Sequence, residues 1–454
     1  MPELIRKKKK MSSFEMIAFG FAGVILLGAI ILMLPISSSA GVVTPFDKTL
    51  FTATSAVCVT GLVVVDTGSY WSAFGQAVIL LLIQTGGLGV ITVVASFSMV
   101  SGRKISLMQR STMQDAISAP KVGGIVRLTK FILQGTFLIE LVGAILMLPV
   151  FCRDYGWKGI WMSVFHSVSA FCNAGFDILG TTEQTFPSLT GYIANPLINL
   201  VIMLLIVIGG IGFLTWDDFC TNKWNLKRYR LQSKIILVTT AVLILLPAIF
   251  FFLSDFAGFS MGKRILASFF QSVTLRTAGF NTADLGAMND SSKAIMTLMM
   301  LIGGSPGSTA GGMKTTTIAV LILNAFATFG REAETEVFGR RFDNTVVKNA
   351  ATIAILYFFL FFTGGIAISQ IEHVALSDCL FETASAVGTA GLTLGITTEL
   401  GLVSHLILVV LMYLGRVGGL TLIYAAISVK IQSGAKRPLD KITCLLYTSD
   451  AADD

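Results

Sequence analysis

Four copies of one short pattern constrain the fold of this chain more than any other feature of its sequence. In each copy a Phe is followed four positions later by a small or β-branched residue, and a Gly lies ten positions after the Phe. The copies are FTATSAVCVTG at 51–61, FHSVSAFCNAG at 165–175, FFQSVTLRTAG at 269–279 and FETASAVGTAG at 381–391. Because each copy lies between two apolar stretches, the repetition predicts one polypeptide that surrounds a central pore with four similar segments.

The composition places the chain in a membrane. Hydrophobic residues make up 54% of the sequence and charged residues 13%, about half the charge of an ordinary soluble protein. Stretches long enough to cross a bilayer, about 20 residues each, predict an all-α integral membrane protein with eight spans. They lie near residues 14–36, 72–100, 128–150, 196–216, 233–253, 294–328, 348–371 and 402–429.

The distribution of Lys and Arg predicts the orientation of these spans. Most of the 33 basic residues lie at the amino end (6–10), after the second, fourth and sixth spans, and in the carboxyl tail. The positive-inside rule makes those segments, and the amino terminus, cytoplasmic. The four repeated patterns then lie in external connections, where acidic residues outnumber basic ones and attract cations. The net charge of +7 is explained by topology and indicates no nucleic-acid partner.

The repeated Gly has a chemical reason in such a pore. An ion that crosses a membrane exchanges its hydration shell for fixed oxygen ligands, which rings of backbone carbonyls supply. Gly allows the positive-φ backbone that such a ring requires, and the stretch before it is too short to span, so we interpret it as a half-helix that enters from outside. A single Gly of this kind is more often a packing or turn residue, whereas four at one offset favour a pore. An inverted-repeat transporter would show two copies of opposite topology.

A second pattern of glycines follows in each repeat, and its last two copies are unusual. The first two copies, at 86–89 and 209–212, are interpreted as close helix packing. In the third, GGSPGSTAGGMKTTT at 303–317 interrupts the span, and no continuous helix tolerates that sequence. We predict an intramembrane gate loop there rather than a fixed kink, with Arg416 of the fourth copy beneath the pore as a barrier to cations and an anchor for the loop. The gate residues are Gly303, Gly304, Ser305, Pro306, Gly307, Gly311, Gly312, Lys314 and Arg416.

The remaining polar residues indicate no chemical reaction. Glu140 and Glu382 are expected to satisfy backbone donors rather than bind ions. Asp217 and Asp218 are expected to be solvated where the fourth span ends. The six cysteines have neither metal-ligand spacing nor a plausible external pair, so no disulfide or zinc site is expected. Without a catalytic nucleophile or phosphate-binding loop, the chain is predicted to be no enzyme and to hold no cofactor.

The residues CVTGL, CNAGF, RTAGF and GTAGL, together with the broken third-repeat span and GRVGGLT at 415–421, resemble the Ktr/Trk superfamily of potassium transporters. With one span before the first pattern, the chain is similar to the Ktr-type membrane subunit. The resemblance implies a potassium-channel-like fold of four pseudo-symmetric M1–P–M2 repeats (span, pore half-helix, span). It also implies K+ as the transported ion, with Na+ able to stimulate or permeate, and a multi-pass location in the cell's inner (plasma) membrane. The implied partners are a second copy in a homodimer and a cytoplasmic ring of RCK-type subunits that binds the regulatory nucleotide.

Transferred residue by residue, the resemblance implies an ion-coordinating filter and a domain organisation. Related plant transporters that have a Ser at the position of Gly61 prefer sodium. The Gly in this chain therefore points to potassium. The repeats are assigned to 1–105, 106–225, 226–335 and 336–443, and residues 444–454 are interpreted as a translated sequencing-adapter end. The filter backbone comprises Val59, Thr60, Gly61, Asn173, Ala174, Gly175, Thr277, Ala278, Gly279, Thr389, Ala390 and Gly391.

Three functions of different classes remain. The first is a gated potassium-conducting pore driven by the electrochemical gradient. The second is a sodium- or proton-coupled potassium symporter, which requires a second ion site, but the sequence has no paired carboxylates at mid-membrane to form one. The third, a structural subunit of a membrane enzyme complex, leaves the four aligned patterns unexplained.

Overall fold

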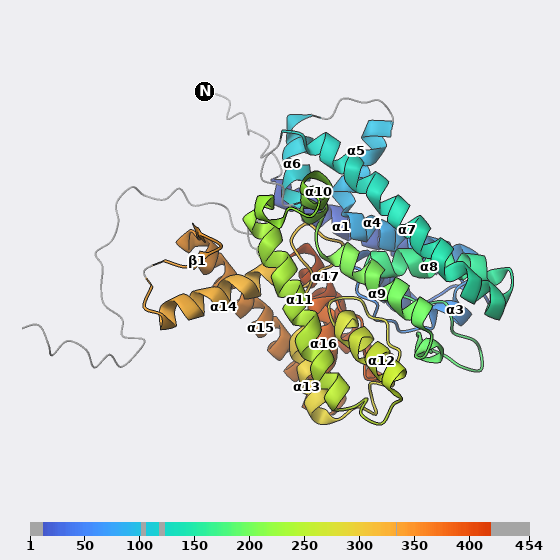
Figure 1. Cartoon of the computed structure of the whole chain (residues 1–454). Coiled ribbons are helices and arrows are strands. Elements are labelled where there is room, and N and C mark those ends of the chain that lie inside the picture. The colour runs from blue at the N-terminus through green and yellow to red at the C-terminus, as the bar shows by residue number, and fades with distance from the viewer. Residues whose placement is uncertain (1–11, 101–105, 118–122, 333, 419–454) are drawn as a thin grey trace, which may run out of the picture.

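The structure, a computed structural model, describes residues 12–100, 106–117, 123–332 and 334–418. The basic cluster at 6–10, the end of the eighth predicted span and the segment at 444–454 lie outside these residues. The described part is almost entirely helical (Figure 1), as the sequence predicted. Its strands are the two-residue pair β1 (Glu336–Val337) and β2 (Arg340–Arg341), which are antiparallel.

The described helices form two groups, four long helices and a larger number of shorter ones. The long ones are α1 (Ser13–Met33), α7 (Ile125–Tyr155), α11 (Leu231–Leu253) and α15 (Asn344–Glu372). The others are α2 (Phe46–Val57), α3 (Thr67–Tyr70), α4 (Ala73–Leu88), α5 (Val90–Val100), α6 (Leu107–Ile117), α8 (Lys158–Phe171), α9 (Pro196–Gly210), α10 (Phe213–Asn222), α12 (Met261–Thr274), α13 (Asp290–Met300), α14 (Thr315–Phe329), α16 (Leu376–Gly388) and α17 (Leu402–Val417). Short 3-10 turns lie at Pro35–Ser37, Thr190–Tyr192, Leu226–Arg228 and Ile396–Thr398.

Four unbroken helices among the described residues, α1, α7, α11 and α15, are long and apolar enough to cross a membrane. Two bent pairs, α4 with α5 and α9 with α10, raise the number of spans to six if each pair counts as one. The sequence predicted eight. Of the other two, one is divided between α13 and α14, and the described part of the last ends soon after α17.

The second and fourth predicted spans are not straight. α4 and α5 meet at 99°, and α9 and α10 meet at 97°. The sequence predicted only a packing role for the glycines at these places. Gly89 and Gly212 have φ angles of +86° and +91°, a conformation that ends a right-handed helix and that residues with a side chain avoid. Gly418, after α17, has a φ of +89°, so the same Gly conformation follows a third helix.

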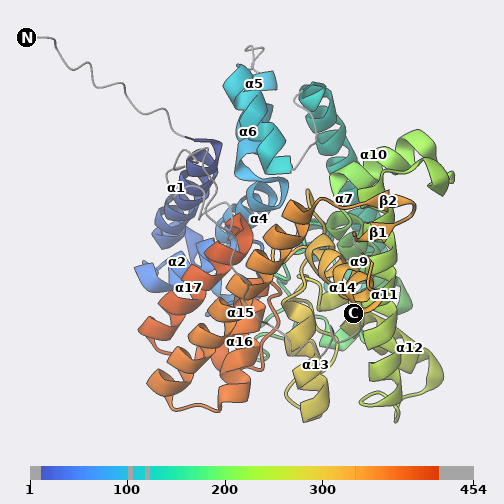
Figure 2. The ribbon, with the colours of Figure 1, turned by 90° about the vertical axis from the view of Figure 1, so that its left-hand side faces the viewer.

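A short helix packs against each long helix that precedes it: α2 on α1, α8 on α7, α12 on α11 and α16 on α15 (Figure 2). In three of these pairs a side-chain hydroxyl of the short helix donates a hydrogen bond to a backbone carbonyl of the long helix. Ser167 Oγ donates to the Glu140 carbonyl oxygen at 2.6 Å, and Ser272 Oγ donates to that of Ile244 at 2.6 Å. Thr383 Oγ1 donates to that of Phe361 at 3.1 Å. Because a polar group in an apolar interior must find a partner, these bonds fix how far each short helix enters the bundle.

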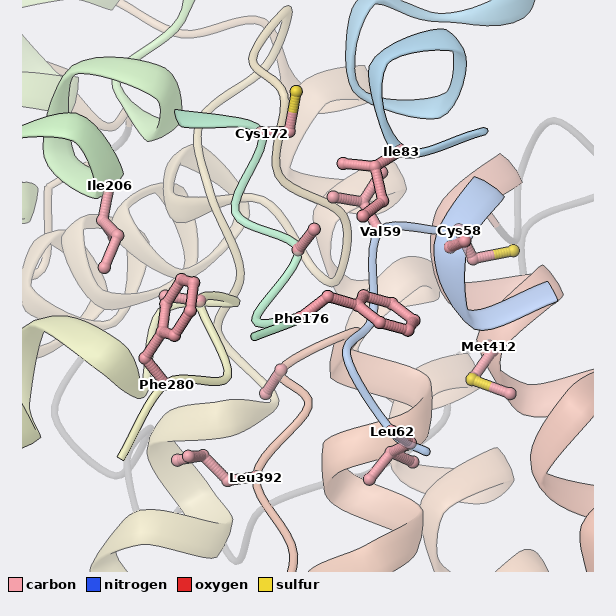
Figure 3. Close-up of a cluster of buried hydrophobic side chains, with 14 of the residues drawn as sticks. Cys58, Val59, Leu62, Ile83, Cys172, Phe176, Ile206, Phe280, Leu392 and Met412 are labelled. Atoms are coloured by element: carbon pink, nitrogen blue, oxygen red, sulfur yellow. The ribbon is translucent and has the colours of Figure 1, made fainter. Parts of the chain in front are cut away.

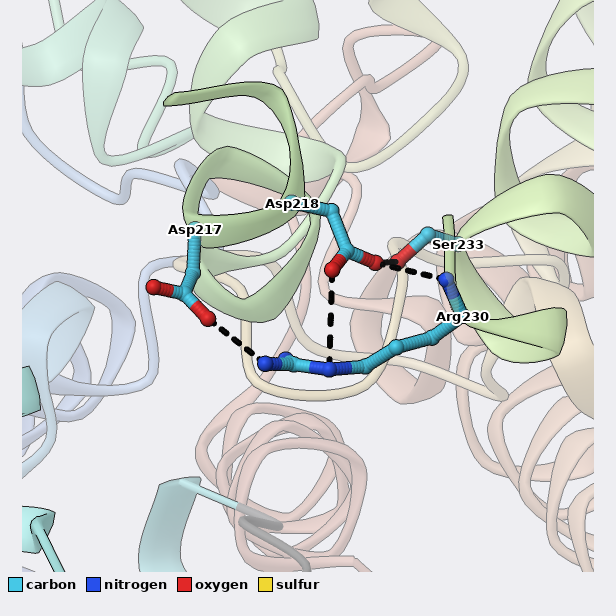
Figure 4. A network of polar contacts seen from close by, with 4 residues as sticks. All are labelled: Asp217, Asp218, Arg230 and Ser233. Atoms are coloured by element: carbon cyan, nitrogen blue, oxygen red, sulfur yellow. Dashed lines mark hydrogen bonds and ion pairs between the residues drawn. The ribbon is translucent and has the colours of Figure 1, made fainter. Parts of the chain in front are cut away.

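The connection between α10 and α11 is held by two acidic residues (Figure 4). Asp217 pairs with the Arg230 guanidinium at 2.6 Å. Asp218, only 3% exposed, accepts from the Arg230 amide at 3.0 Å and the Ser233 hydroxyl at 2.6 Å. The expectation that both are simply solvated is wrong for Asp218, because the chain reverses there and leaves donors at the start of α11 that need an acceptor.

Candidate functional site

The four repeated patterns end in four buried loops that follow α2, α8, α12 and α16. Each loop has a non-Gly residue with positive φ two positions before a Gly that also has positive φ. The φ angles of the first residue are +57° at Val59, +59° at Asn173, +60° at Thr277 and +53° at Thr389. Because a non-Gly residue in this conformation costs roughly 1–3 kcal/mol, four equivalent instances indicate a geometry that the surrounding structure imposes.

The residue four positions after each Phe explains how the loops are held. In the first loop Ser55 accepts twice: its hydroxyl from the Gly61 amide at 3.1 Å, and its carbonyl from the Thr60 amide at 2.8 Å. The carbonyls of Ser169 and Ser385 accept at 2.7 Å from the equivalent amides of Ala174 and Ala390. The third repeat has Val273 at this position, and the neighbouring Thr274 hydroxyl donates to the Phe280 carbonyl instead. The sequence pattern alone predicts no role for this position.

The four loops face one another in a closed order. A Cβ built on each Gly would lie too close to a carbonyl oxygen of the next loop in the chain, and the fourth loop returns to the first. These distances are 2.5 Å from Gly61 to Ala174, 2.7 Å from Gly175 to Ala278, 3.0 Å from Gly279 to Ala390 and 2.1 Å from Gly391 to Thr60. Figure 3 shows that the residues after these glycines, Leu62, Phe176, Phe280 and Leu392, come from four separate loops around one region.

The backbone amides and the backbone carbonyls of these loops differ in their hydrogen bonding. Eight of the twelve filter amides donate back to the short helices. In contrast, no backbone carbonyl of the twelve filter residues accepts a hydrogen bond from another described residue. The side-chain hydroxyls of Thr60, Thr277 and Thr389 are likewise buried without a partner in the described part of the chain. Buried acceptors are normally paired. The loops therefore present a set of free oxygen ligands, which is the donor set that an alkali cation requires.

The non-helical break in the third repeat lies directly beside these loops. It extends over residues 301–314. Residues 315–317, which the sequence predicted to belong to it, form the first turn of α14. The glycines that prevent a helix end at Gly312. The Thr309 hydroxyl donates to the Phe171 carbonyl and to Asn173 Oδ1, both at 3.1 Å. A Cβ on Gly311 would lie 2.3 Å from Thr389 Oγ1.

Backbone hydrogen bonds join the same break to the neighbouring repeats. The Ser305 amide donates to the Gly210 carbonyl at 2.9 Å, and the Thr309 amide to the Gly209 carbonyl at 3.2 Å. The Gly312 amide donates to the Gly415 carbonyl at 3.2 Å. Gly209, Gly210 and Gly415 belong to the second glycine pattern, so that pattern accepts hydrogen bonds from the loop in addition to packing closely.

Two half-buried cations, Lys314 and Arg416, hold the carbonyls of this loop. The Arg416 guanidinium donates to the Thr309 carbonyl and, on its other side, to Gly86 and to Gly87, the last at 3.2 Å. Lys314 Nζ donates to the Ala310 carbonyl at 2.8 Å. Neither forms an ion pair within the part of the chain that the structure describes. Both border a cavity of about 340 Å³ whose other lining includes Asp115 and Tyr357.

The two buried glutamates, Glu140 and Glu382, differ in the groups that donate hydrogen bonds to their carboxyls. The Glu382 carboxyl accepts from the Leu394 amide at 3.0 Å and the Thr393 hydroxyl at 2.6 Å, and it also accepts from the Thr397 hydroxyl. It therefore satisfies a backbone donor, as the sequence predicted. The Glu140 carboxyl instead accepts from the side-chain amide of Gln84 at 3.2 Å, so the expected backbone donor is wrong for this residue.

Replacing Glu382 by alanine is expected to lower the thermal stability of the protein. The change removes the acceptor of three donors, the buried Thr397 hydroxyl and the half-buried Leu394 amide and Thr393 hydroxyl, and an unsatisfied buried donor costs roughly 1–3 kcal/mol. Thermal unfolding of the purified protein in detergent measures the effect. Glu399→Ala, which removes an exposed carboxyl from the same external segment, is the control and should leave the midpoint unchanged. Equal midpoints for both variants would contradict the bracing role of Glu382.

Comparisons with known proteins agree with this architecture. The family described as "TrkH: Cation transport protein" matches residues 14–435. The chain is 37% identical to the potassium/sodium uptake protein NtpJ of Enterococcus hirae, over 92% of the chain and 94% of that protein. It is also 37% identical to the Ktr system potassium uptake protein B of Bacillus subtilis, over 90% of the chain and 92% of that protein.

A solved structure shares the fold. The crystal structure of the potassium transporter TrkH from Vibrio parahaemolyticus matches with a TM-score of 0.72 at 18% identity, covering 94% of this chain and 87% of that one. The relatives are uptake proteins and transporters, which confirms the prediction that the chain is not an enzyme. The extent and identity of these matches show that the chain belongs to the TrkH/Ktr family of cation transport proteins.

Proposed function

We propose that this protein mediates potassium uptake across the cell's inner (plasma) membrane through a filter formed by its four facing loops. The observation that carries the proposal is the ring of buried backbone carbonyls, which have no partner among the described residues. Such carbonyls replace the hydration shell of an ion without the cost of burying a full opposing charge. The names of the relatives, potassium uptake and potassium/sodium uptake proteins, support K+ as the ion, with Na+ as a second ion that stimulates or permeates.

In this proposal four M1–P–M2 repeats surround the filter. α1, α7, α11 and α15 are the first spans, and α2, α8, α12 and α16 are the pore half-helices. Their carboxyl ends lead directly into the filter loops, so their dipoles place partial negative charge beside a cation on the pathway. The closed order of the Gly contacts supports this arrangement, because only four segments around a common centre return from the last loop to the first.

The gate in this proposal is the loop at 301–314 with Lys314 and Arg416. Thr309 and Gly311 of this loop contact the inner residues of two filter loops. In this position the loop blocks the path of the ions. Its carbonyls are held by two cations, whose positive charge adds a barrier to K+. For the path to open, the loop has to leave the Arg416 guanidinium and its partners in α9. This requirement makes the gate responsive to movements of the surrounding helices.

Removing the hydroxyl of Thr309 is expected to weaken the closed gate. Thr309→Val keeps the shape of the side chain but loses its bonds to Phe171 and Asn173, and a net loss of about 1 kcal/mol shifts a closed-to-open equilibrium roughly fivefold. Potassium uptake measured without a regulatory partner should rise by about that factor. Thr297→Val, which removes an internal α13 bond to Lys293, is the matched control. Unchanged uptake in Thr309→Val would contradict the placement of the gate.

The proposal includes partners outside this chain. Relatives named as Ktr system proteins support a cytoplasmic ring of RCK-type subunits that binds the regulatory nucleotide, and a homodimer as the membrane unit. The amino terminus is cytoplasmic in this arrangement, as the distribution of Lys and Arg predicted. No cofactor within this chain is required, because K+ is the transported substrate.

Flux into vesicles distinguishes this function from the symporter alternative. The purified protein is reconstituted, and a potassium gradient is imposed without any sodium or proton gradient. A gated pore admits potassium under these conditions until its electrochemical potential is equal on both sides. Uptake that requires a sodium or proton gradient would contradict passive conduction and favour the symporter.

A further inference from the structure

The connection between α9 and α11 carries a surface that the pore does not use. α10 leaves α9 at 97° and projects from the side of the bundle in Figure 2. A helix nearly perpendicular to a membrane span runs along the membrane surface. The inference drawn from this geometry rests on the proposed function, because it takes from there the orientation that places α10 on the cytoplasmic side.

Apolar side chains are exposed at the far end of α10. Trp224 is 86% exposed, Leu226 58% and Phe219 51%, and the rings of Phe219 and Trp224 pack edge to face with centroids 5.8 Å apart. In water such a cluster is unfavourable. Amphipathic aromatic rings are most stable at the boundary between lipid headgroups and acyl chains, which is where a helix on the membrane surface holds them.

Positive charge surrounds these rings. Lys223, Lys227 and Arg228 are exposed, and none of them forms an ion pair with another described residue. The nearby Arg230 differs, because Asp217 and Asp218 pair with it. The segment therefore presents three uncompensated cations beside three exposed apolar side chains.

The surface is held rigidly on the transmembrane part of the protein. Asp217 and Asp218 tie the end of the connection to Arg230 and Ser233 at the start of α11 (Figure 4). The Tyr229 hydroxyl donates to the Lys223 carbonyl, which closes the turn from inside. A partner that binds this surface thus meets an ordered arrangement and does not have to order it first.

We propose that the surface formed by Phe219, Lys223, Trp224, Leu226, Lys227 and Arg228 binds anionic phospholipid headgroups of the cytoplasmic leaflet. The three cations match the negative surface potential of such lipids. The rings and Leu226 reach the apolar side of the headgroup layer. A soluble acidic protein would match the charges, but it would not explain apolar side chains exposed at the end of α10 and in the turn that follows it.

Fluorescence quenching in vesicles tests this proposal. The purified full chain is reconstituted with brominated phosphatidylglycerol or brominated phosphatidylcholine, and the Trp224 signal is obtained from the difference between the parent and Trp224→Phe. Phosphatidylglycerol is expected to quench Trp224 roughly twice as strongly as phosphatidylcholine, because the cations concentrate it locally. Trp157 is 88% exposed on the opposite side of the membrane and, measured through Trp157→Phe, is expected to show no preference.

The cations are tested by a variant that carries Lys223→Gln, Lys227→Gln and Arg228→Gln. It should retain potassium uptake and lose the preference of Trp224 for phosphatidylglycerol. A preference that survives in this variant would overturn the proposal. Quenching of Trp224 by neither lipid, with protection on addition of a regulatory subunit, would also overturn it and assign the surface to a protein partner. Because quenching requires no transport, absence of potassium uptake in both lipids would count against the proposed function alone.

Discussion

Replacing Gly391 by alanine is expected to abolish potassium uptake. The added Cβ would lie 2.1 Å from the Thr60 carbonyl oxygen and 3.0 Å from the Gly61 Cα, distances at which one of the two loops has to move. The φ angle of +82° adds a further cost of roughly 1–2 kcal/mol for a residue with a side chain. Because the displaced atom is a proposed ion ligand, the loss appears in transport. Uptake of potassium by cells that lack their own uptake systems measures it.

Gly395, four residues further on, provides a matched control. Its φ angle is +100°, but a Cβ there has no atom within 4 Å. Gly395→Ala therefore carries a similar backbone strain without a contact between loops, and it should retain most of the uptake. Equal uptake by the two variants would contradict the conclusion that Gly391 faces its neighbour across the ion path. Amounts of protein in the membrane are compared to separate assembly from conduction.

Replacing Arg416 by alanine is expected to raise potassium uptake in the absence of a regulatory partner by tenfold or more. The guanidinium joins the Thr309 carbonyl of the loop to Gly86 and Gly87 of α4. Each hydrogen bond to a charged group contributes about 1.5–3 kcal/mol, and about 1.4 kcal/mol corresponds to a tenfold change. Removal of the side chain also removes a positive charge that opposes cations. Initial uptake rates, with and without the partner, measure the effect.

A lysine at position 416 separates the two contributions of the arginine. An ammonium group keeps the charge but lacks the planar fork that reaches carbonyls on both sides. Arg416→Lys should therefore show a smaller increase in uptake than Arg416→Ala. If neither variant changed the basal uptake, the guanidinium would hold no gate. The ratio of potassium to sodium uptake should stay constant in both, because the filter loops are unchanged.

The repeated pattern was sufficient to predict four short helices, each followed by a loop with a positive-φ Gly, because each element of the pattern has a local cause. The Gly at its end requires positive φ, and it has that conformation in all four loops. The Phe and the residue four positions later lie on one face of a short helix, and both are buried in the first, second and fourth repeats. In the third repeat Phe269 is exposed and its neighbour Phe270 is buried instead. All twelve predicted filter residues lie in the four facing loops. Their role as ion ligands remains a prediction.

Other features depend on contacts that no local pattern specifies. The bends at Gly89 and Gly212 were missed because a Gly within an apolar stretch is equally compatible with a straight helix. The bonds of Arg416 join residues more than 100 positions apart in the chain, and only the folded arrangement brings them together. The same holds for Asp218, whose partners in α11 become available only after the chain reverses direction.

The most direct measurement is potassium uptake by a cell without its own uptake systems that carries either the parent chain or Gly61→Ser, each with and without external sodium. A Ser side chain at this position would lie 2.5 Å from the Ala174 carbonyl oxygen and would distort the ring of ligands. The expected result is potassium uptake by the parent and a loss of potassium selectivity or affinity in the variant. Equal affinity and selectivity in both chains would contradict a filter built from these four loops.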